Sequence, residues 1–306
     1  MVVKKVVGKK VAIRKSVPVP QAVPMKKSVV AKKLVNPPIA TVKTVPVKRQ
    51  VVTKAVMDAN VARVKPTQGI GRVSSGISDL DDVMEGGFEK NSAVLVSGGG
   101  GSGKTIFGMQ FLMEGITKFD ETGVYISFEE NKAKFYKHML RFGWDLTQLE
   151  SEGRFVFIEY DPEEMAEIVE SGGGAIGTEL MQVQGKRIVI DSLSAYTVLF
   201  DREADQRKKL VDLFTMIESW DATTVVIAEE NPSIDKFQSS VMGFMADAII
   251  YLYNIIRENV MLRAMQIAKM RGTKHTQRIF PIMIGESGIK AYPTQDIFEY
   301  SFDKKS

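Results

Sequence analysis

The sequence predicts an α/β domain in which a mainly parallel sheet is flanked by helices and closed at one edge by a C-terminal antiparallel β-meander. Three observations predict it. From about residue 67 onward, apolar β-branched runs alternate with stretches of helical periodicity, as in βαβ units. A glycine-rich loop lies between the first apolar run and the first helical stretch. From residue 248 to 292 the apolar runs follow one another without helices between them.

Each element has its own signal along the chain. Large apolar residues recur at helical spacing after the first apolar run and predict a helix over 104–118. A second helix is predicted over 131–141. A right-handed crossover should place the strand that follows the first helix beside the first strand or one position away. The parallel strands are predicted at 92–97, 124–128, 154–159, 187–191 and 223–228, and the antiparallel strands at 248–252, 262–269, 279–284 and 288–292.

A second glycine-rich stretch occurs at 171–177. It follows a helical stretch and not a strand, so it lacks the context that a phosphate-binding loop requires. We therefore interpret it as a flexible connection.

The N-terminal segment differs in composition from the rest of the chain. Residues 1–65 contain sixteen Lys and Arg but only one acidic residue, Asp58, giving a charge of +15, whereas the remaining chain sums to −11. Val, Lys and Pro recur throughout this segment, and no aromatic residue precedes Phe88. Such a composition is typical of disordered chain. We predict a basic, disordered tail over 1–66 and one folded domain over 67–306.

Composition also excludes several classes of site. The chain has no cysteine, so it forms no disulfide and no thiolate metal site. Its two histidines, His138 and His275, are too few for a histidine-rich metal site, and we interpret His138 as a surface helix residue. No apolar stretch approaches the roughly 18–20 residues of a membrane span, and the N-terminus lacks the continuous apolar region of a signal peptide. These features favour a cytoplasmic location.

The glycine-rich loop, 98–105, reads GGGGSGKT and matches the P-loop pattern GxxxxGK[ST]. Glycines allow backbone N–H groups to curl around phosphate oxygens, and the following helix directs its positive N-terminal dipole at the anion. Lys104 would neutralise the β- and γ-phosphates of ATP, and the Thr105 hydroxyl would bind Mg²⁺. The predicted nucleotide-binding residues of the loop are Gly98, Gly101, Ser102, Gly103, Lys104, Thr105 and Ile106.

Acidic residues end two of the predicted strands. Asp191 ends the strand at 187–191, at the edge where parallel sheets bind ligands, and would hold the Mg²⁺ shell through water. The alternative is an aspartate that caps the following turn. Glu129 and Glu130 end the strand at 124–128, where a carboxylate can orient and deprotonate the attacking water. Because neighbouring residues on a strand point in opposite directions, only one of the two should face the γ-phosphate; the alternative is a solvated turn pair.

Four stretches of this sequence resemble the KaiC family, a branch of the RecA-like P-loop ATPases. They are SGISDLDDVMEGGFEK at 75–90, FEE at 128–130, FGWDL at 142–146 and KMRGTKH at 269–275. Together they extend over nearly all of 67–295 in the family's order and spacing. The clock protein has two such domains in tandem, whereas this chain has one and is similar to the single-domain, KaiC-like proteins of archaea.

The resemblance implies a homo-oligomeric ring, expected to be a hexamer, with ATP and Mg²⁺ between subunits. It implies that Glu129 and Glu130 are the catalytic pair. Lys269, Arg271, Thr273 and His275 would reach the ATP of the neighbouring subunit, with the basic pair acting as arginine fingers act. The alternative for Lys269 and Arg271 is that they are solvated charges at a strand end.

Two departures from the family pattern bear on function. The clock kinase half has Ser and Thr directly before an aspartate in the stretch that corresponds to 244–250, whereas this chain has Phe244, Met245 and Ala246. Clock-type autophosphorylation is therefore not expected, although Ser239 and Ser240 leave other phosphorylation open. The glycines at 172–174 also lie where the family has helix.

Three functions remain open from the sequence. The first is an ATP-hydrolysing, ring-forming regulator or scaffold. The second is a RecA-class motor or recombinase that grips DNA or RNA with its basic tail; the stretch KMRGTKH, in place of recognisable DNA-binding loops, argues against it. The third is a switch that binds ATP and scarcely hydrolyses it, against which the Glu129–Glu130 pair argues. The tail could equally solubilise the protein, dock a protein partner or bind anionic lipid.

Overall fold

The computed structural model describes residues 71–234, 241–257 and 259–297. The predicted tail at 1–66 lies outside the described residues, as do Ser239 and Ser240.

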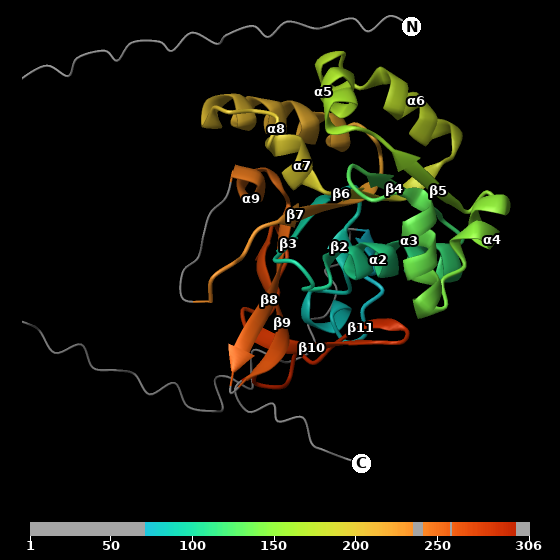
Figure 1. The fold of residues 1–306 in the computed structure, drawn as a ribbon. Helices are drawn as coiled ribbons and strands as arrows, with labels where there is room; N and C mark the ends of the chain where they lie inside the picture. The colour runs from blue at the N-terminus through green and yellow to red at the C-terminus, as the bar shows by residue number, and fades with distance from the viewer. Residues whose placement is uncertain (1–70, 235–240, 258, 298–306) are drawn as a thin grey trace, which may run out of the picture. The chain divides into compact units, whose positions relative to one another are not determined.

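The centre of the domain is a nine-stranded sheet with the order β11-β10-β9-β8-β3-β7-β6-β4-β5 (Figure 1). Its strands are β3 (Ala93–Gly98), β4 (Thr122–Ser127), β5 (Phe155–Glu159), β6 (Gly185–Asp191), β7 (Thr223–Glu229), β8 (Ala248–Arg257), β9 (Val260–Met270), β10 (Ile279–Gly285) and β11 (Gly288–Ala291). A short ribbon pairs β1 (Arg72–Val73) with β2 (Phe88–Glu89). The strands from β8 to β5 pair in parallel, and those from β8 to β11 pair antiparallel, which confirms the predicted fold class.

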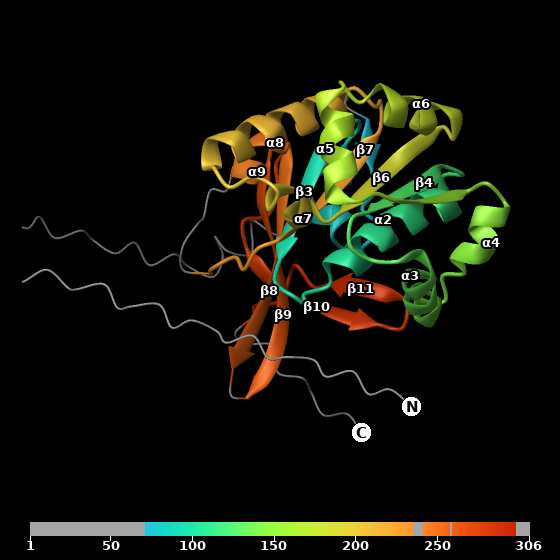
Figure 2. The same cartoon turned by 45° about the horizontal axis from the view of Figure 1, so that its top comes forward.

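Helices cover both faces of this sheet (Figures 1 and 2). They are α2 (Lys104–Lys118), α3 (Lys132–Met139), α4 (Leu146–Ser151), α5 (Pro162–Glu170), α6 (Gly174–Gln182), α7 (Leu193–Thr197), α8 (Glu203–Glu218) and α9 (Val241–Met245), with 3₁₀ turns η1 (Asp81–Val83) and η2 (Leu140–Phe142). One core packs α2, α3 and α4 against one face, and a second packs α5 to α8 against the other. No helix among the described residues is long and apolar enough to span a bilayer.

One expectation about strand placement is right only in part, because β8 pairs antiparallel with β9 alone, and a second is wrong. β8 pairs in parallel with β3, so the antiparallel part begins only at the β8–β9 hairpin. β4 lies three positions from β3, because β7 and β6 are inserted between them. The physical reason is the same in both cases. The chain crosses back over the sheet before β6, β7 and β8, so each of these strands runs in the same direction as β3. The spacing of the strands along the sequence does not determine their order in the sheet.

The glycine stretch at 171–177 is partly helical, which corrects its interpretation as a flexible connection. Gly172 and Gly173 have positive φ angles of 85° and 72° and form the turn that joins α5 to α6. Gly174 and Gly177 lie within α6 itself. Each helical glycine costs roughly 1 kcal/mol relative to alanine. Buried Ile176 and Leu180 anchor α6 in the second core, and this packing outweighs the weak local propensity.

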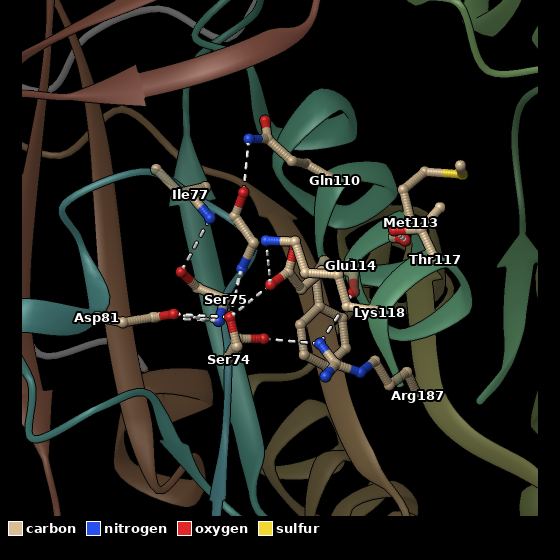
Figure 3. A network of polar contacts seen from close by, with 12 residues as sticks. Ser74, Ser75, Ile77, Asp81, Gln110, Met113, Glu114, Thr117, Lys118 and Arg187 are labelled. Atoms are coloured by element: carbon tan, nitrogen blue, oxygen red, sulfur yellow. Dashed lines mark hydrogen bonds and ion pairs between the residues drawn. The ribbon is translucent and has the colours of Figure 1, made fainter. Parts of the chain in front are cut away.

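The segment from Ser74 to Asp81, which we call the lead-in segment, is fixed to the helix that begins at the P-loop (Figure 3). The guanidinium of Arg187, only 2% exposed, donates to the carbonyls of Ser74 at 2.6 Å and Phe111 at 3.1 Å. Gln110 on α2 donates to the Gly76 carbonyl at 2.8 Å, and the Ser74 hydroxyl lies 2.7 Å from Asp81. These contacts connect the lead-in segment to the middle of α2, the helix that begins at the P-loop.

Candidate active site

The predicted P-loop joins β3 to α2 in a conformation that requires glycine. Gly101 and Gly103 have positive φ angles of 72° and 106°, which side chains rarely allow. A Cβ on Gly98 would lie 2.7 Å from the Leu252 carbonyl. No side chain caps the N-terminus of α2, and no acidic residue lies in its first turn. The loop therefore presents the uncapped, positive end of a helix, as anion binding requires.

The cationic group of the loop lies over the loop itself. The Lys104 ammonium donates to the Gly99 carbonyl at 3.0 Å and lies 3.9 Å from the Glu229 carboxylate. The Ser102 hydroxyl is buried and has no partner among the described residues. Half-buried Ile106 packs against the core beneath the helix. A close glycine backbone, an available ammonium and an unpartnered hydroxyl fit the phosphates of a nucleotide.

Asp191 and Thr105, the two predicted magnesium residues, are in direct contact. The Thr105 hydroxyl donates to Oδ2 of Asp191 at 2.9 Å, which brings the end of β6 to the start of α2. Burial raises the pKa of Asp191, whereas hydrogen bonds from Tyr125 and Thr105 and the charge of Lys104 oppose that rise. A hydroxyl and a carboxylate are hard oxygen donors, the ligands that Mg²⁺ prefers. Thr105 and Asp191 together fit the inner or outer coordination shell of Mg²⁺.

Glu129 and Glu130 follow β4 and have different partners. Glu129 is exposed, and its carboxylate accepts a 2.9 Å hydrogen bond from Ser192, the residue after Asp191. Glu130 lies 3.1 Å from Nδ1 of His138 on α3. His138 is thus a partly exposed helix residue, as predicted, but one with a carboxylate partner. Both glutamates line a pocket of about 310 Å³. The divergent partners agree with the expectation that the two carboxylates face different ways.

The predicted trans residues lie away from the chain's own P-loop. The Lys269 ammonium donates to the carbonyls of Gly243, Phe244 and Ala246, at the end of α9. Burial, followed by the charge of Arg271, lowers the pKa of Lys269. Thr273 accepts a 2.9 Å hydrogen bond from Arg72, and His275 contacts the Thr276 carbonyl at 2.9 Å.

Arg271 lies far from the P-loop of its own chain. It pairs with Asp247 at 3.0 Å, and Asp247 accepts a hydrogen bond from the backbone of Ala93, the first residue of β3. The P-loop follows Gly98, the last residue of β3, and six strand residues extend over roughly 17 Å. Within one chain the predicted fingers and the P-loop are therefore at opposite ends of a strand.

Several residues at this site were missed by sequence reasoning. Glu229 ends β7 beside Lys104, and its backbone N–H donates to the Ser194 hydroxyl at 2.6 Å. The rule that singled out acidic residues at strand ends would have found it. Asn254 and Arg263 donate to the P-loop carbonyls of Gly100 and Gly101, at 2.9 and 3.0 Å. They come from β8 and β9, about 150 residues later, and no local signal marks them.

Comparisons with known proteins show the family to which the chain belongs. A family model described as "ATPase: KaiC" matches residues 73–296. The chain is 32% identical over 235 residues to the circadian clock oscillator protein KaiC of Synechococcus elongatus, covering 74% of this chain and 45% of the relative. It is 33% identical over 242 residues to the circadian clock protein KaiC3 of a Synechocystis strain, covering 76% and 47%. The chain thus spans less than half the length of these curated relatives.

Among solved structures, a KaiC-like protein from the hyperthermophilic archaeon Pyrococcus horikoshii is similar, with a TM-score of 0.65 and 30% identity. The match covers 74% of this chain and 100% of that protein. The match thus extends over the whole of that solved chain. The P-loop, the Thr105–Asp191 contact and the family match over 73–296 lead to one conclusion: this chain belongs to the KaiC family of RecA-like P-loop ATPases.

Proposed function

We propose that this protein binds ATP with Mg²⁺ at the P-loop and hydrolyses it as a subunit of a hexameric ring with a regulatory or scaffolding role. The observation that best supports hydrolysis is the meeting of three strand ends at the P-loop. Lys104 and Thr105 lie beside Asp191, and Ser192 joins that turn to Glu129. A phosphate cradle, a magnesium-binding pair and a carboxylate acceptor are thus adjacent, as phosphoryl transfer to water requires.

Each group has a defined part in this proposal. Mg²⁺, when bound, supplies charge neutralisation to the phosphate oxygens. Lys104 and the helix N-terminus bind and orient the phosphates, and Asp191 with Thr105 holds the metal ion. Glu129 or Glu130 orients the attacking water and accepts its proton. Clock-type autophosphorylation is not proposed, because Phe244, Met245 and Ala246 provide no hydroxyl.

The position of Arg271 supports the proposal of a ring. A guanidinium near Ala93 cannot reach the phosphates of its own chain, but 53% of its side chain is exposed and available to a neighbour. Lys269 binds three carbonyls of its own chain, so we assign Arg271 the finger role and Lys269 the support of the α9 end. Thr273 and His275 would accompany Arg271 at the neighbour's nucleotide.

Mixing two inactive variants tests the trans arrangement. Arg271→Ala should lower ATP turnover by roughly a hundredfold or more, since a finger contributes a thousandfold or more in other P-loop enzymes. The Glu129→Gln/Glu130→Gln double variant should also be inactive. Mixed rings contain sites with the glutamates of one chain and the arginine of the other, so activity should return on mixing. Turnover is measured by phosphate release, and assembly by sizing with and without ATP.

Arg271→Lys is the matched control, because it keeps the charge beside Asp247 but loses the planar fork. Its assembly should equal that of wild type. The trans role would be excluded if Arg271→Ala assembled and hydrolysed ATP as well as wild type. Mixed rings that regain no activity would contradict it equally, because a finger acting in cis cannot complement.

The positive charge of the N-terminal segment supports a second candidate function, the binding of nucleic acid. Sixteen cations in residues 1–65 can lie along a polyanion, and neutralised phosphates release condensed counterions. Without aromatic residues for stacking, little sequence preference is expected. On this hypothesis the ATPase is coupled to DNA or RNA through the tail.

Truncation tests that hypothesis. We expect the full chain to bind duplex DNA and RNA with an affinity that falls steeply as salt rises. A protein beginning near Lys65 should lose most of this affinity and show a flatter salt slope, while its ATPase activity survives. The measurement is a binding titration of both proteins at several salt concentrations. Equal binding by both would exclude the tail as the nucleic-acid element, and binding by neither at low salt would exclude the second function.

A further inference from the structure

Tyr125 on β4 is held rigidly on the face of the sheet that carries α2. Its side chain is 1% exposed. The ring stacks on Phe157 of β5, with centroids 5.6 Å apart and planes within 4°, and lies 4.4 Å from the ring of Phe135 on α3. These contacts leave the phenol oxygen little freedom to move.

The hydroxyl of this tyrosine is directed at Asp191. It donates to Oδ2 at a distance of 2.5 Å, and the Thr105 hydroxyl donates to the same oxygen at 2.9 Å. The other carboxylate oxygen, Oδ1, accepts no hydrogen bond from the described part of the chain. Two donors from β4 and α2 thus hold one oxygen of the carboxylate, and no donor among the described residues binds the second.

We propose that Tyr125 is a positioning residue for magnesium: it fixes the Asp191 carboxylate so that one oxygen is held by the protein and the other is free for the Mg²⁺ shell. This inference rests on the proposed function of the same site and adds a residue that touches neither nucleotide nor metal. A carboxylate that is already held by hydrogen-bond donors loses less conformational freedom when the metal ion binds. Sequence reasoning gave Tyr125 no part beyond a buried strand.

A structural role for the same hydroxyl makes a different prediction. If Tyr125 merely satisfied a buried carboxylate, its loss would weaken folding and leave the response to Mg²⁺ unchanged. If it positions Asp191, its loss should weaken the magnesium-dependent part of nucleotide binding. Binding without Mg²⁺ depends on the P-loop and should be unaffected.

Tyr125→Phe removes only the hydroxyl and keeps the ring contacts with Phe135 and Phe157. ADP binding to the full chain is measured by calorimetry in EDTA and across a series of Mg²⁺ concentrations. We expect the ADP affinity in EDTA to be unchanged. The increase in ADP affinity that Mg²⁺ produces should be about tenfold smaller than in wild type, the size typical of losing one hydrogen bond to a charged group. In an Asp191→Asn background, Tyr125→Phe should add little, since both act through one contact.

Tyr196→Phe is the matched control. Tyr196 on α7 is also fully buried, and its hydroxyl has no partner among the described residues. This variant should keep the wild-type response to Mg²⁺, and thermal unfolding reports whether each variant is folded. The inference is overturned if folded Tyr125→Phe keeps the wild-type response, or if its affinity falls equally with and without Mg²⁺. A wild-type protein that ignores Mg²⁺ would overturn the proposed function itself, and the inference with it.

Discussion

Replacing Lys104 with alanine should abolish ATP binding. The ammonium is the cation of the P-loop, and its hydrogen bonds to phosphate oxygens are charge-assisted. Its removal also leaves the Glu229 carboxylate, 3.9 Å from Nζ in the present structure, facing the phosphates without a countercharge. The loss of two charge-assisted hydrogen bonds to phosphate, of about 1.5–3 kcal/mol each, corresponds to a loss of affinity of roughly a hundredfold or more. The measurement is nucleotide affinity by calorimetry.

The matched control for this variant lies on the same helix. Lys118 ends α2, is 65% exposed and pairs with Glu114 one turn earlier. Lys118→Ala should bind ATP like wild type and change the free energy of unfolding by less than about 0.5 kcal/mol. Folded Lys104→Ala protein that keeps wild-type affinity would mean that the P-loop is not the nucleotide site.

The double variant Glu129→Gln/Glu130→Gln should bind ATP normally and hydrolyse it roughly a hundredfold more slowly or worse. Glutamine keeps the shape of glutamate, and its carbonyl can still accept the hydrogen bond from Ser192. It cannot accept the proton of the attacking water. Turnover is measured by phosphate release at saturating ATP, and affinity by calorimetry on the same protein.

The two single variants decide which carboxylate is the base. Glu129 contacts the turn that carries Asp191, whereas Glu130 contacts His138, so only one should reproduce the double variant. Glu164→Gln is the matched control, because Glu164 lines the same pocket and caps α5 in a way that glutamine preserves. Unaltered turnover in the double variant would refute the assignment of a base. Wild-type protein that binds ATP and scarcely hydrolyses it would favour a switch.

Local signals predicted the helix that follows the P-loop and the fold class correctly. The boundaries of the helix at 104–118 were confirmed, because a phosphate loop, a helix start and periodic apolar residues coincide there. The α/β fold class was confirmed for a similar reason, since strand and helix periodicities are encoded within a few residues. The glycines at 171–177 show the limit of such signals. They were predicted to form a flexible connection, but buried side chains of α6 contact residues far along the chain and stabilise the helix.

The sequence by itself located the candidate nucleotide site of this protein. Lys104, Thr105, Asp191 and the glutamates after β4 could be named because each occurs at a strand end or loop with a recognisable local pattern. Only the tertiary structure decided how these pieces meet. It inserted β7 and β6 between β3 and β4, placed Arg271 at the far end of β3, and brought Tyr125 onto Asp191. Strand order and cross-sheet contacts arise from burial between segments distant in sequence, and periodicity carries no information about them.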